Sequence, residues 1–244
     1  MSSFNPGPFT PAGRRAGPID YTQADEYSVG RFMNNVYAWM SAGLALTAGV
    51  AWMVSQNIDA FLPLLRGPVV LLLILAQLGL VVAISGAVNR ISAGVATGLF
   101  LLYAALNGLT LSTIFLVYSG ATIASAFIIT AGMFGVTSVY GYVTKADLTR
   151  LGSLMFMALI GLVIASVVNI FWANSTLHWI INYAGVFIFV GLTAYDTQKL
   201  KAIAHQLEGN AAMAARLSIS GALRLYLDFL NLFLFLLRIL GNRR

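Results

Sequence analysis

Long apolar segments, interrupted only by short polar stretches, dominate this chain of 244 residues. Hydrophobic residues make up 59% of it and charged residues only 9%, whereas an ordinary soluble domain is roughly 25% charged. So few charged side chains do not cover a water-exposed surface of this size, and the chain is therefore expected to face lipid. This composition excludes a cytosolic enzyme, and the absence of cysteine excludes a disulfide-bonded scaffold and Cys-ligated metal sites.

Seven of the apolar segments reach the length of about 20 residues that a membrane-spanning helix needs. No proline follows Pro68, which favours long uninterrupted helices. Several connections are too short to hold a domain, so the helices are expected to be antiparallel neighbours. The predicted fold is all-α, a polytopic membrane protein with seven transmembrane helices. The expected spans are residues 32–54, 68–88, 93–118, 122–143, 152–171, 177–195 and 217–240.

The first 31 residues differ in composition from the rest of the chain, since four of the six prolines lie there among glycines and charged residues. Such a segment buries too little apolar area to order itself. We therefore expect residues 1–31 to form a mobile cytoplasmic tail and residues 32–244 to form the transmembrane domain. No short apolar stretch with a cleavage site marks the tail as a signal peptide.

The distribution of Lys and Arg predicts a cytoplasmic N-terminus, because cytoplasmic loops of membrane proteins are rich in both. With this orientation the opposite loops hold only Arg66, although Arg243 and Arg244 then fall outside unless the last segment is re-entrant. The loop bias also explains the net charge of +6 without a nucleic-acid partner. The basic residues assigned to the cytoplasm are Arg14, Arg15, Arg31, Arg90, Lys145, Arg150, Lys199, Lys201 and Arg216.

Two acidic residues lie at membrane depth in this arrangement, where an ionisable side chain is costly and usually functional. Asp228 lies about halfway along the last expected span, and Asp196 closes the sixth. Each also has a purely structural explanation. Arg224 precedes Asp228 by one helical turn and can pair with it. Asp196 can be solvated at the headgroup level or paired with Lys199.

A functional interpretation takes the two carboxylates together. Two carboxylates from neighbouring helices, held close in a site of low dielectric constant, do not easily both ionise and titrate as a unit. The pair is expected to share a proton near neutral pH and to lose it as the pH rises, and the resulting repulsion can move a helix. Asp196 and Asp228 also form a possible site for a hard cation such as Ca²⁺. Arg90 is a candidate counter-charge, and an anchor at the membrane surface is an equally good role for it.

The two aspartate segments carry a family resemblance. They read AYDTQ at residues 194–198 and LYLDFLNLF at residues 225–233, with supporting matches NGLT at 107–110 and NIF at 169–171. With these motifs the chain, from about Phe32 onward, resembles the transmembrane Bax inhibitor motif family, specifically its bacterial branch.

The resemblance implies six helices around a central last helix, in a bacterial inner membrane. Characterised relatives behave as pH-sensitive calcium leak channels, in which an aspartate pair and an arginine act as latch and sensor. The corresponding pH sensor here is Asp196 and Asp228, with Arg90. Gln77 departs from the pattern, because some relatives have an acid there, and this weakens cation binding on the conduction path.

We therefore expect a slow, pH-gated cation leak, with Ca²⁺ as the first candidate ion, no cofactor and no enzymatic activity. Two alternatives remain open. The protein either conducts nothing and regulates another membrane protein, such as a quality-control protease, or uses the same carboxylates as a relay in a proton-coupled transporter.

Overall fold

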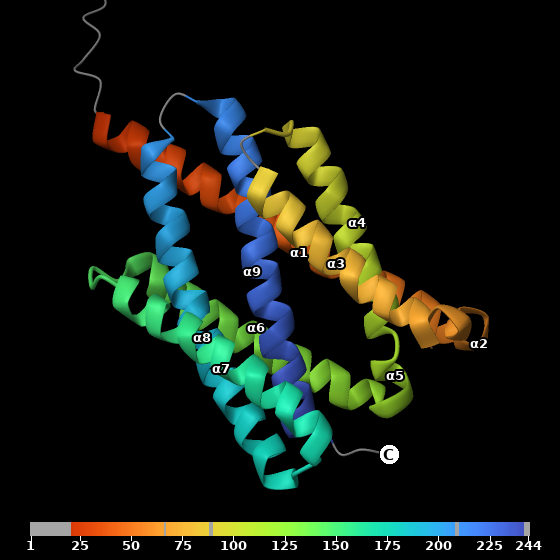
Figure 1. The fold of residues 1–244 in the computed structure, drawn as a ribbon. Coiled ribbons are helices and arrows are strands. Elements are labelled where there is room, and N and C mark those ends of the chain that lie inside the picture. The colour runs from red at the N-terminus through yellow and green to blue at the C-terminus, as the bar shows by residue number, and fades with distance from the viewer. Residues whose placement is uncertain (1–20, 66, 88–89, 208–209, 242–244) are drawn as a thin grey trace, which may run out of the picture.

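The computed structural model describes residues 21–65, 67–87, 90–207 and 210–241, with only the backbone described for residues 21–28. Within these ranges every regular element is a helix, which confirms the all-α prediction (Figure 1). The elements are α1 (Tyr21–Gln56), α2 (Ile58–Phe61), the 3-10 helix η1 (Leu62–Leu65), α3 (Gly67–Ala87), α4 (Ala93–Leu111), α5 (Ile114–Val117), α6 (Gly120–Val143), α7 (Thr149–Trp172), α8 (Ser175–Gln206) and α9 (Ala211–Leu240).

Six segments of the described chain are long and apolar enough to cross a membrane, and they correspond to the first six predicted spans. They are Val29–Gln56, Gly67–Ala87, Ala93–Val117, Gly120–Val143, Thr149–Trp172 and Ser175–Gln206. The seventh predicted span is α9, one continuous helix of 30 residues. At 1.5 Å per residue it is about 45 Å long, more than the roughly 30 Å of a bilayer core. An all-α polytopic membrane fold is therefore confirmed.

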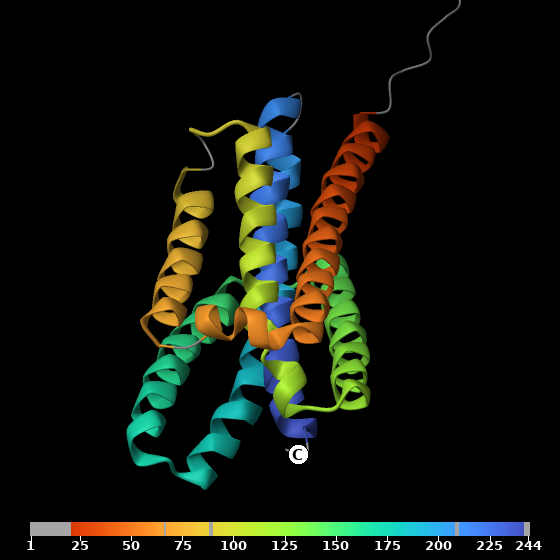
Figure 2. The same ribbon diagram turned by 90° about the vertical axis from the view of Figure 1, so that its right-hand side faces the viewer.

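The last helix is central. α9 packs against α1, α4, α6 and α8, which surround it (Figure 2). Half of its 30 residues are buried, whereas Ile84 is the only buried residue of α3, and α7 buries only Gly152 and Leu162. The apolar side chains of α3 and α7 thus point outward, as expected where lipid is the solvent, and α9 supplies the core.

Two helices extend beyond their predicted ends. α1 begins at Tyr21, inside the segment 1–31 that the sequence assigns to a tail, and residues 1–20 of that segment lie outside the described residues. α8 continues to Gln206, past the predicted end at residue 195. Hydropathy ends a predicted span where polar residues begin, but a helix continues into water as long as its backbone hydrogen bonds can form.

The third predicted span is broken near its end. Ser112 and Thr113 separate α4 from α5, and their hydroxyl groups donate to the carbonyl oxygens of Leu109 and Thr110 at 2.7 and 2.9 Å. Such local side-chain hydrogen bonds compete with the helical backbone pattern. The break therefore has a local cause that hydropathy does not detect.

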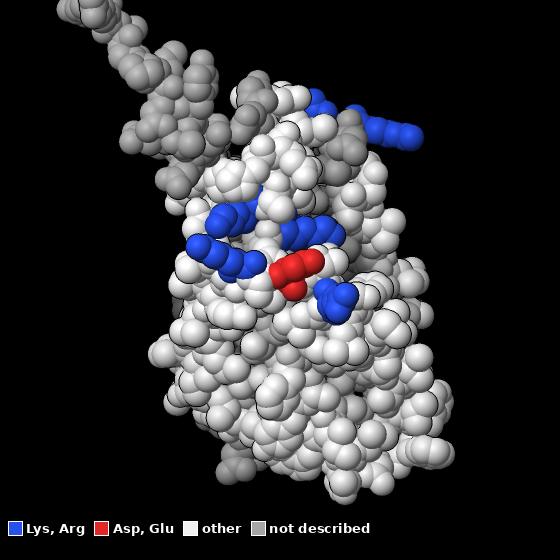
Figure 3. Space-filling model, turned by 90° about the vertical axis from the view of Figure 1, so that its left-hand side faces the viewer, with Lys and Arg blue, Asp and Glu red and all other residues white. Residues whose placement is uncertain are grey.

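Charged side chains gather toward one end of the bundle. Figure 3 shows Lys and Arg around an acidic group on one face, with a broad area below it that carries no charge. The beginnings of α1 and α9 lie at the same end of the bundle, and α9 ends at the other (Figure 2). This arrangement fits the predicted clustering of Lys and Arg on one side, while the cytoplasmic location of that side stays a prediction.

Candidate functional site

The structure brings Asp196 and Asp228 together. Asp196 lies on α8 and Asp228 on α9, two helices that pack side by side. Their carboxyl groups are close enough to interact electrostatically. Both residues are buried, with 7% and 5% of their surface exposed. The two acids, 32 residues apart in the sequence, thus lie at one helix contact, while their role as a pH sensor stays a prediction.

One arginine completes this cluster. The Arg224 guanidinium donates from Nη1 to Asp196 Oδ1 at 3.2 Å. The sequence offered Arg224 as an intrahelical partner of Asp228, but its ion pair instead joins α9 to α8. Asp228 Oδ2 is buried and has no hydrogen-bond partner in the described part of the chain. The site therefore combines the Arg224–Asp196 ion pair with one Asp228 carboxyl oxygen that has no partner in the described part of the chain, and Lys199 lies nearby as a second cation.

The other two residues that the sequence associated with this site lie elsewhere. Arg90 is exposed in the turn between α3 and α4, so its role as a counter-charge to the aspartates stays a prediction. Gln77 lies on α3, and its amide donates to Leu106 O at 3.0 Å and to Thr110 Oγ1 at 3.3 Å. Gln77 therefore holds α3 against α4 rather than facing the aspartates.

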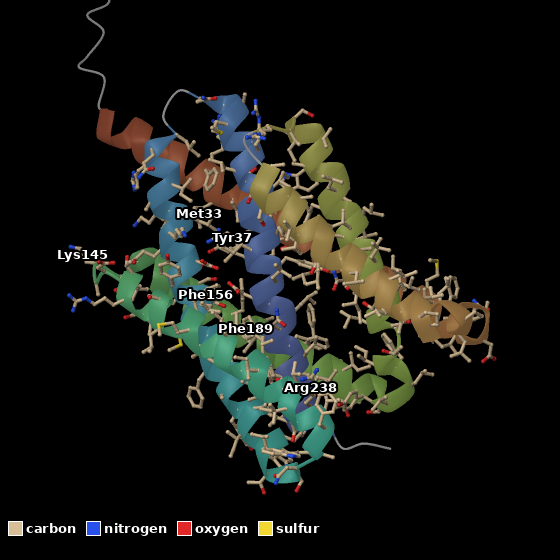
Figure 4. The ribbon with its side chains drawn as sticks, in the orientation of Figure 1. Met33, Tyr37, Lys145, Phe156, Phe189 and Arg238 are labelled. Atoms are coloured by element: carbon tan, nitrogen blue, oxygen red, sulfur yellow. The ribbon has the colours of Figure 1, made fainter. Side chains whose placement is uncertain are left out.

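A cavity of about 680 Å³ between α7, α8 and α9 reaches the carboxyl pair. Its polar part contains Asp196, Asp228, Lys199 and Arg224, together with Asn231. Its apolar part is lined by aromatic and aliphatic side chains, among them Phe156 from α7 and Phe189 from α8 (Figure 4). Small polar ligands and water thus have space next to the two buried acids.

The opposite side of α9 is anchored by a tyrosine that the sequence did not single out. The Tyr226 hydroxyl lies 2.6 Å from Thr47 Oγ1, and the Thr47 hydroxyl donates to Ala104 O at 2.9 Å. The Tyr226 ring also makes edge contacts with Phe100 and Tyr103. Tyr226 and Asp228 are two residues apart and so point to opposite sides of α9. One side of α9 is therefore bonded to α1 and α4, and the other side faces Asp196.

The extension of α8 beyond Asp196 holds the connection between α6 and α7. Gln198 Oε1 accepts from Leu148 N at 2.9 Å, and Gln198 Nε2 donates to Ala146 O at 2.8 Å. Lys201 Nζ donates to Tyr142 O at 2.9 Å and lies over the Tyr142 ring. Gln198 belongs to the AYDTQ segment, so this motif serves both the carboxyl pair and the adjacent loop.

The same loop contains an ionised carboxylate that contrasts with the buried pair. Asp147 is fully exposed, and hydrogen bonds from the Thr149 hydroxyl and backbone N–H, together with the Arg150 charge, hold the pKa of Asp147 below its ordinary value. Asp147 therefore stays charged at neutral pH, which makes it a suitable control for experiments on the buried acids.

Replacing Gln198 by alanine is expected to expose the loop to protease. The change removes two hydrogen bonds that contribute about 1 kcal/mol each, so opening of the loop becomes roughly 5- to 30-fold more frequent. Trypsin should cleave correspondingly faster after Lys145, which lies at the outer end of the loop (Figure 4). Gln198→Glu keeps the acceptor for Leu148 N, so its cleavage rate should lie between those of wild type and Gln198→Ala. An unchanged cleavage rate in Gln198→Ala would show that the two Gln198 hydrogen bonds do not hold the loop closed.

Comparison with known proteins identifies the family. The family model described as "Inhibitor of apoptosis-promoting Bax1" matches residues 29–244. The inner membrane protein YbhL of Escherichia coli is 54% identical over 215 residues, which cover 87% of this chain and 92% of YbhL. A protein of Borreliella burgdorferi is 46% identical over 230 residues, which cover 93% of this chain and 99% of the relative. The chain therefore belongs to the Bax inhibitor family of membrane proteins, as its two aspartate motifs indicated.

Proposed function

We propose that this protein is a pH-sensitive cation leak channel of a bacterial inner membrane, with Ca²⁺ as the first candidate ion. The observation that carries the proposal is the buried Asp196–Asp228 pair, which a single arginine accompanies. The name of the Escherichia coli relative supports the location. The proposed activity is passive conduction and involves no chemical reaction.

The proposed gate follows from the charges at the helix contact. With one shared proton, the two carboxyl groups carry a single negative charge, which the Arg224 ion pair balances directly, while the exposed Lys199 adds a positive charge at the wall of the same cavity. Loss of that proton leaves two negative carboxylates facing each other in a site of low dielectric constant, where like charges repel strongly. Because Asp228 lies on α9 and Asp196 on α8, this repulsion acts between the two helices. We infer that raising the pH shifts the equilibrium toward an open arrangement.

Ca²⁺ fits this site as a permeant ion better than as a resident one. A stable Ca²⁺ site supplies six to eight oxygen ligands, and the described residues contain no group of three or more His, Cys, Asp and Glu side chains. Arg224 also competes for Asp196 while the ion pair is intact. A cation therefore gains most from the pair after the proton has left, which couples pH to conduction.

The direct test is Ca²⁺ release from liposomes that contain the purified protein. We expect the rate to rise as the pH is raised from acidic to alkaline values, by at most about tenfold per pH unit for one titrating group. Protein-free liposomes supply the background. A rate equal to this background at every pH overturns the channel proposal and favours the non-conducting regulator. If the outflow of a preloaded cation drives protons into the liposomes against their gradient, the result favours the proton-coupled transporter.

A further inference from the structure

Two cavities enter the bundle from opposite ends and stop short of each other. The first is the cavity of about 680 Å³ at the carboxyl pair, which extends along α8 to Phe189 and along α9 to Asn231. The second, of about 510 Å³, lies where α7 ends, α8 begins and α9 ends, and Trp179 is the last residue of α8 that lines it. Ten residues separate Trp179 from Phe189, which is about 15 Å of helix. A short stretch of the α8–α9 contact therefore divides two hollow spaces that open toward opposite ends of the bundle.

Two stacked aromatic rings close this stretch on the side of the carboxyl pair. The ring centres of Phe189 on α8 and Phe235 on α9 lie 5.9 Å apart, with 29° between the ring planes, and both side chains are buried. Phe189 lies about midway along the bundle (Figure 4). Each phenylalanine is seven residues from the aspartate of its own helix, so the rings lie about 10 Å from the carboxyl pair on the same helix faces. The rings thus form an apolar layer directly beyond the first cavity.

The Phe235 ring fits closely because α8 has no side chain at Gly185. A Cβ atom at Gly185 would lie only 2.6 Å from the nearest atom of the Phe235 ring. The ring is therefore enclosed by the backbone of α8 at Gly185 and by the Phe189 ring, and water has no polar partner in this layer.

A buried amide without a partner lies beyond the rings. Asn182 is only 1% exposed, and neither Oδ1 nor Nδ2 has a hydrogen-bond partner among the described residues. Asn182 precedes Phe189 by seven residues, as Phe189 precedes Asp196, so all three lie on one face of α8. Burying an amide without a hydrogen bond is costly, and such a group in a folded protein needs an explanation. Packing does not supply one, because leucine has a similar volume and avoids this cost.

We propose that a cation crosses the protein along this α8–α9 contact, from the carboxyl pair to the second cavity, with the Phe189–Phe235 rings as the barrier and Asn182 as a binding site beyond them. This path rests on the proposed channel function and adds to it the barrier and the binding site. An ion that enters a dry apolar layer loses its hydration, and apolar constrictions close pores for this reason. When α8 and α9 separate at the carboxyl pair, the rings part, and Asn182 Oδ1 becomes an oxygen ligand of the kind that Ca²⁺ accepts.

The barrier is tested by Ca²⁺ release from liposomes at low pH, where the carboxyl pair keeps its proton and the wild-type leak is slow. Phe189→Ser places a hydroxyl group in the apolar layer and should raise this rate roughly tenfold, which corresponds to a barrier lower by about 1.4 kcal/mol. Phe189→Leu keeps the layer apolar and should stay near the wild-type rate. Phe187→Ser is the matched control, because Phe187 lies on the same helix and is 74% exposed, and its rate should equal that of wild type.

The binding site is tested at high pH, where the wild-type leak is fast. Asn182→Leu removes the amide at similar volume and should slow Ca²⁺ release about fivefold, the factor expected for one lost interaction of about 1 kcal/mol. An amide with a purely structural role predicts a different result, since leucine would then stabilise the fold and leave the rate unchanged.

A cysteine at this position shows directly whether water and cations reach it. The chain contains no cysteine, so Asn182→Cys introduces a single thiol that a cationic methanethiosulfonate can modify. Its reaction rate is divided by that of Asp147→Cys, an exposed position, because the thiolate fraction itself depends on pH. We expect this ratio to rise together with Ca²⁺ release as the pH is raised, and to stay low when Asp228→Asn is added.

Three results overturn the path and leave the channel proposal standing, because wild type still conducts in each of them. They are an unchanged low-pH rate in folded Phe189→Ser, an unchanged high-pH rate in Asn182→Leu, and a thiol at position 182 that stays protected while Ca²⁺ release is fast. The thermal midpoint of each variant shows whether it is folded. Absence of Ca²⁺ release from wild type at every pH overturns the channel proposal and the path together.

Discussion

Replacing Asp228 by asparagine is expected to remove the pH dependence of Ca²⁺ release and to leave only a slow, constant leak. Asparagine has nearly the same shape as a protonated aspartate but cannot lose a proton. The repulsion between α8 and α9 then never develops, because Asp196 keeps its partner Arg224 and faces a neutral group. At high pH, where the wild-type pair has lost its proton, the variant should leak at least about tenfold more slowly than wild type, whereas at lower pH, where the pair keeps its proton, the two should leak at similar rates.

The measurement is the liposome assay over the same pH range, with Asp147→Asn as the matched control. Asp147 is exposed in the α6–α7 loop and its pKa is held low by the Thr149 hydrogen bonds, so it is ionised throughout and its replacement should preserve the wild-type profile. Asp196→Asn should also flatten the profile, but it leaves Arg224 without its partner and is less clean. If both aspartate variants keep the wild-type pH dependence, the pair is not the gate.

The sequence predicted the spans and the acid pair because both depend on simple physical quantities. The length of an apolar segment determines whether it can cross a bilayer. An acid within such a segment is costly whatever its helix packs against, so it stands out from the sequence alone. Asp196 and Asp228 lie on consecutive antiparallel helices, so the sequence already places them on neighbouring helices, and the packing of α9 on α8 brings them to one contact. The central position of the last helix, however, was predicted from the family resemblance and not from hydropathy.

The partner of the acid pair was harder to predict, because it depends on the side-chain direction between helices. Arg224 precedes Asp228 by four residues, and sequence spacing alone favours a pair within α9. In the structure the guanidinium reaches Asp196 on α8 instead. The Tyr226–Thr47 hydrogen bond is similar, since it joins residues 179 positions apart and follows only from how α9 packs on α1. A signal for Arg224 was present, since few basic residues lie within the last predicted span.

Replacing Gly141 by alanine is expected to destabilise the protein more than its single methyl group suggests. Gly141 on α6 packs directly on α8, and a Cβ atom at this position would overlap the backbone carbonyl of Ala194. A backbone group within a helix cannot rotate aside as a flexible side chain does, so α6 and α8 must move apart. Overpacking of this kind costs about 1–3 kcal/mol. Because Ala194 is two residues from Asp196, the shift should also disturb the carboxyl pair.

Gly135→Ala is the matched control for this prediction. Gly135 lies on the same helix, but nothing lies within 4 Å of an added Cβ, so the higher helix propensity of alanine should leave stability unchanged or raise it by up to about 1 kcal/mol. Reversible unfolding in detergent compares the two variants, and the liposome assay then shows whether Gly141→Ala also alters the pH profile. Equal stability of the variants would mean that α6 and α8 can separate at no cost. In that case the close approach at Gly141 would not hold α8 in place beside α9, and the position of Asp196 would depend on the Arg224 ion pair and the Gln198 contacts instead.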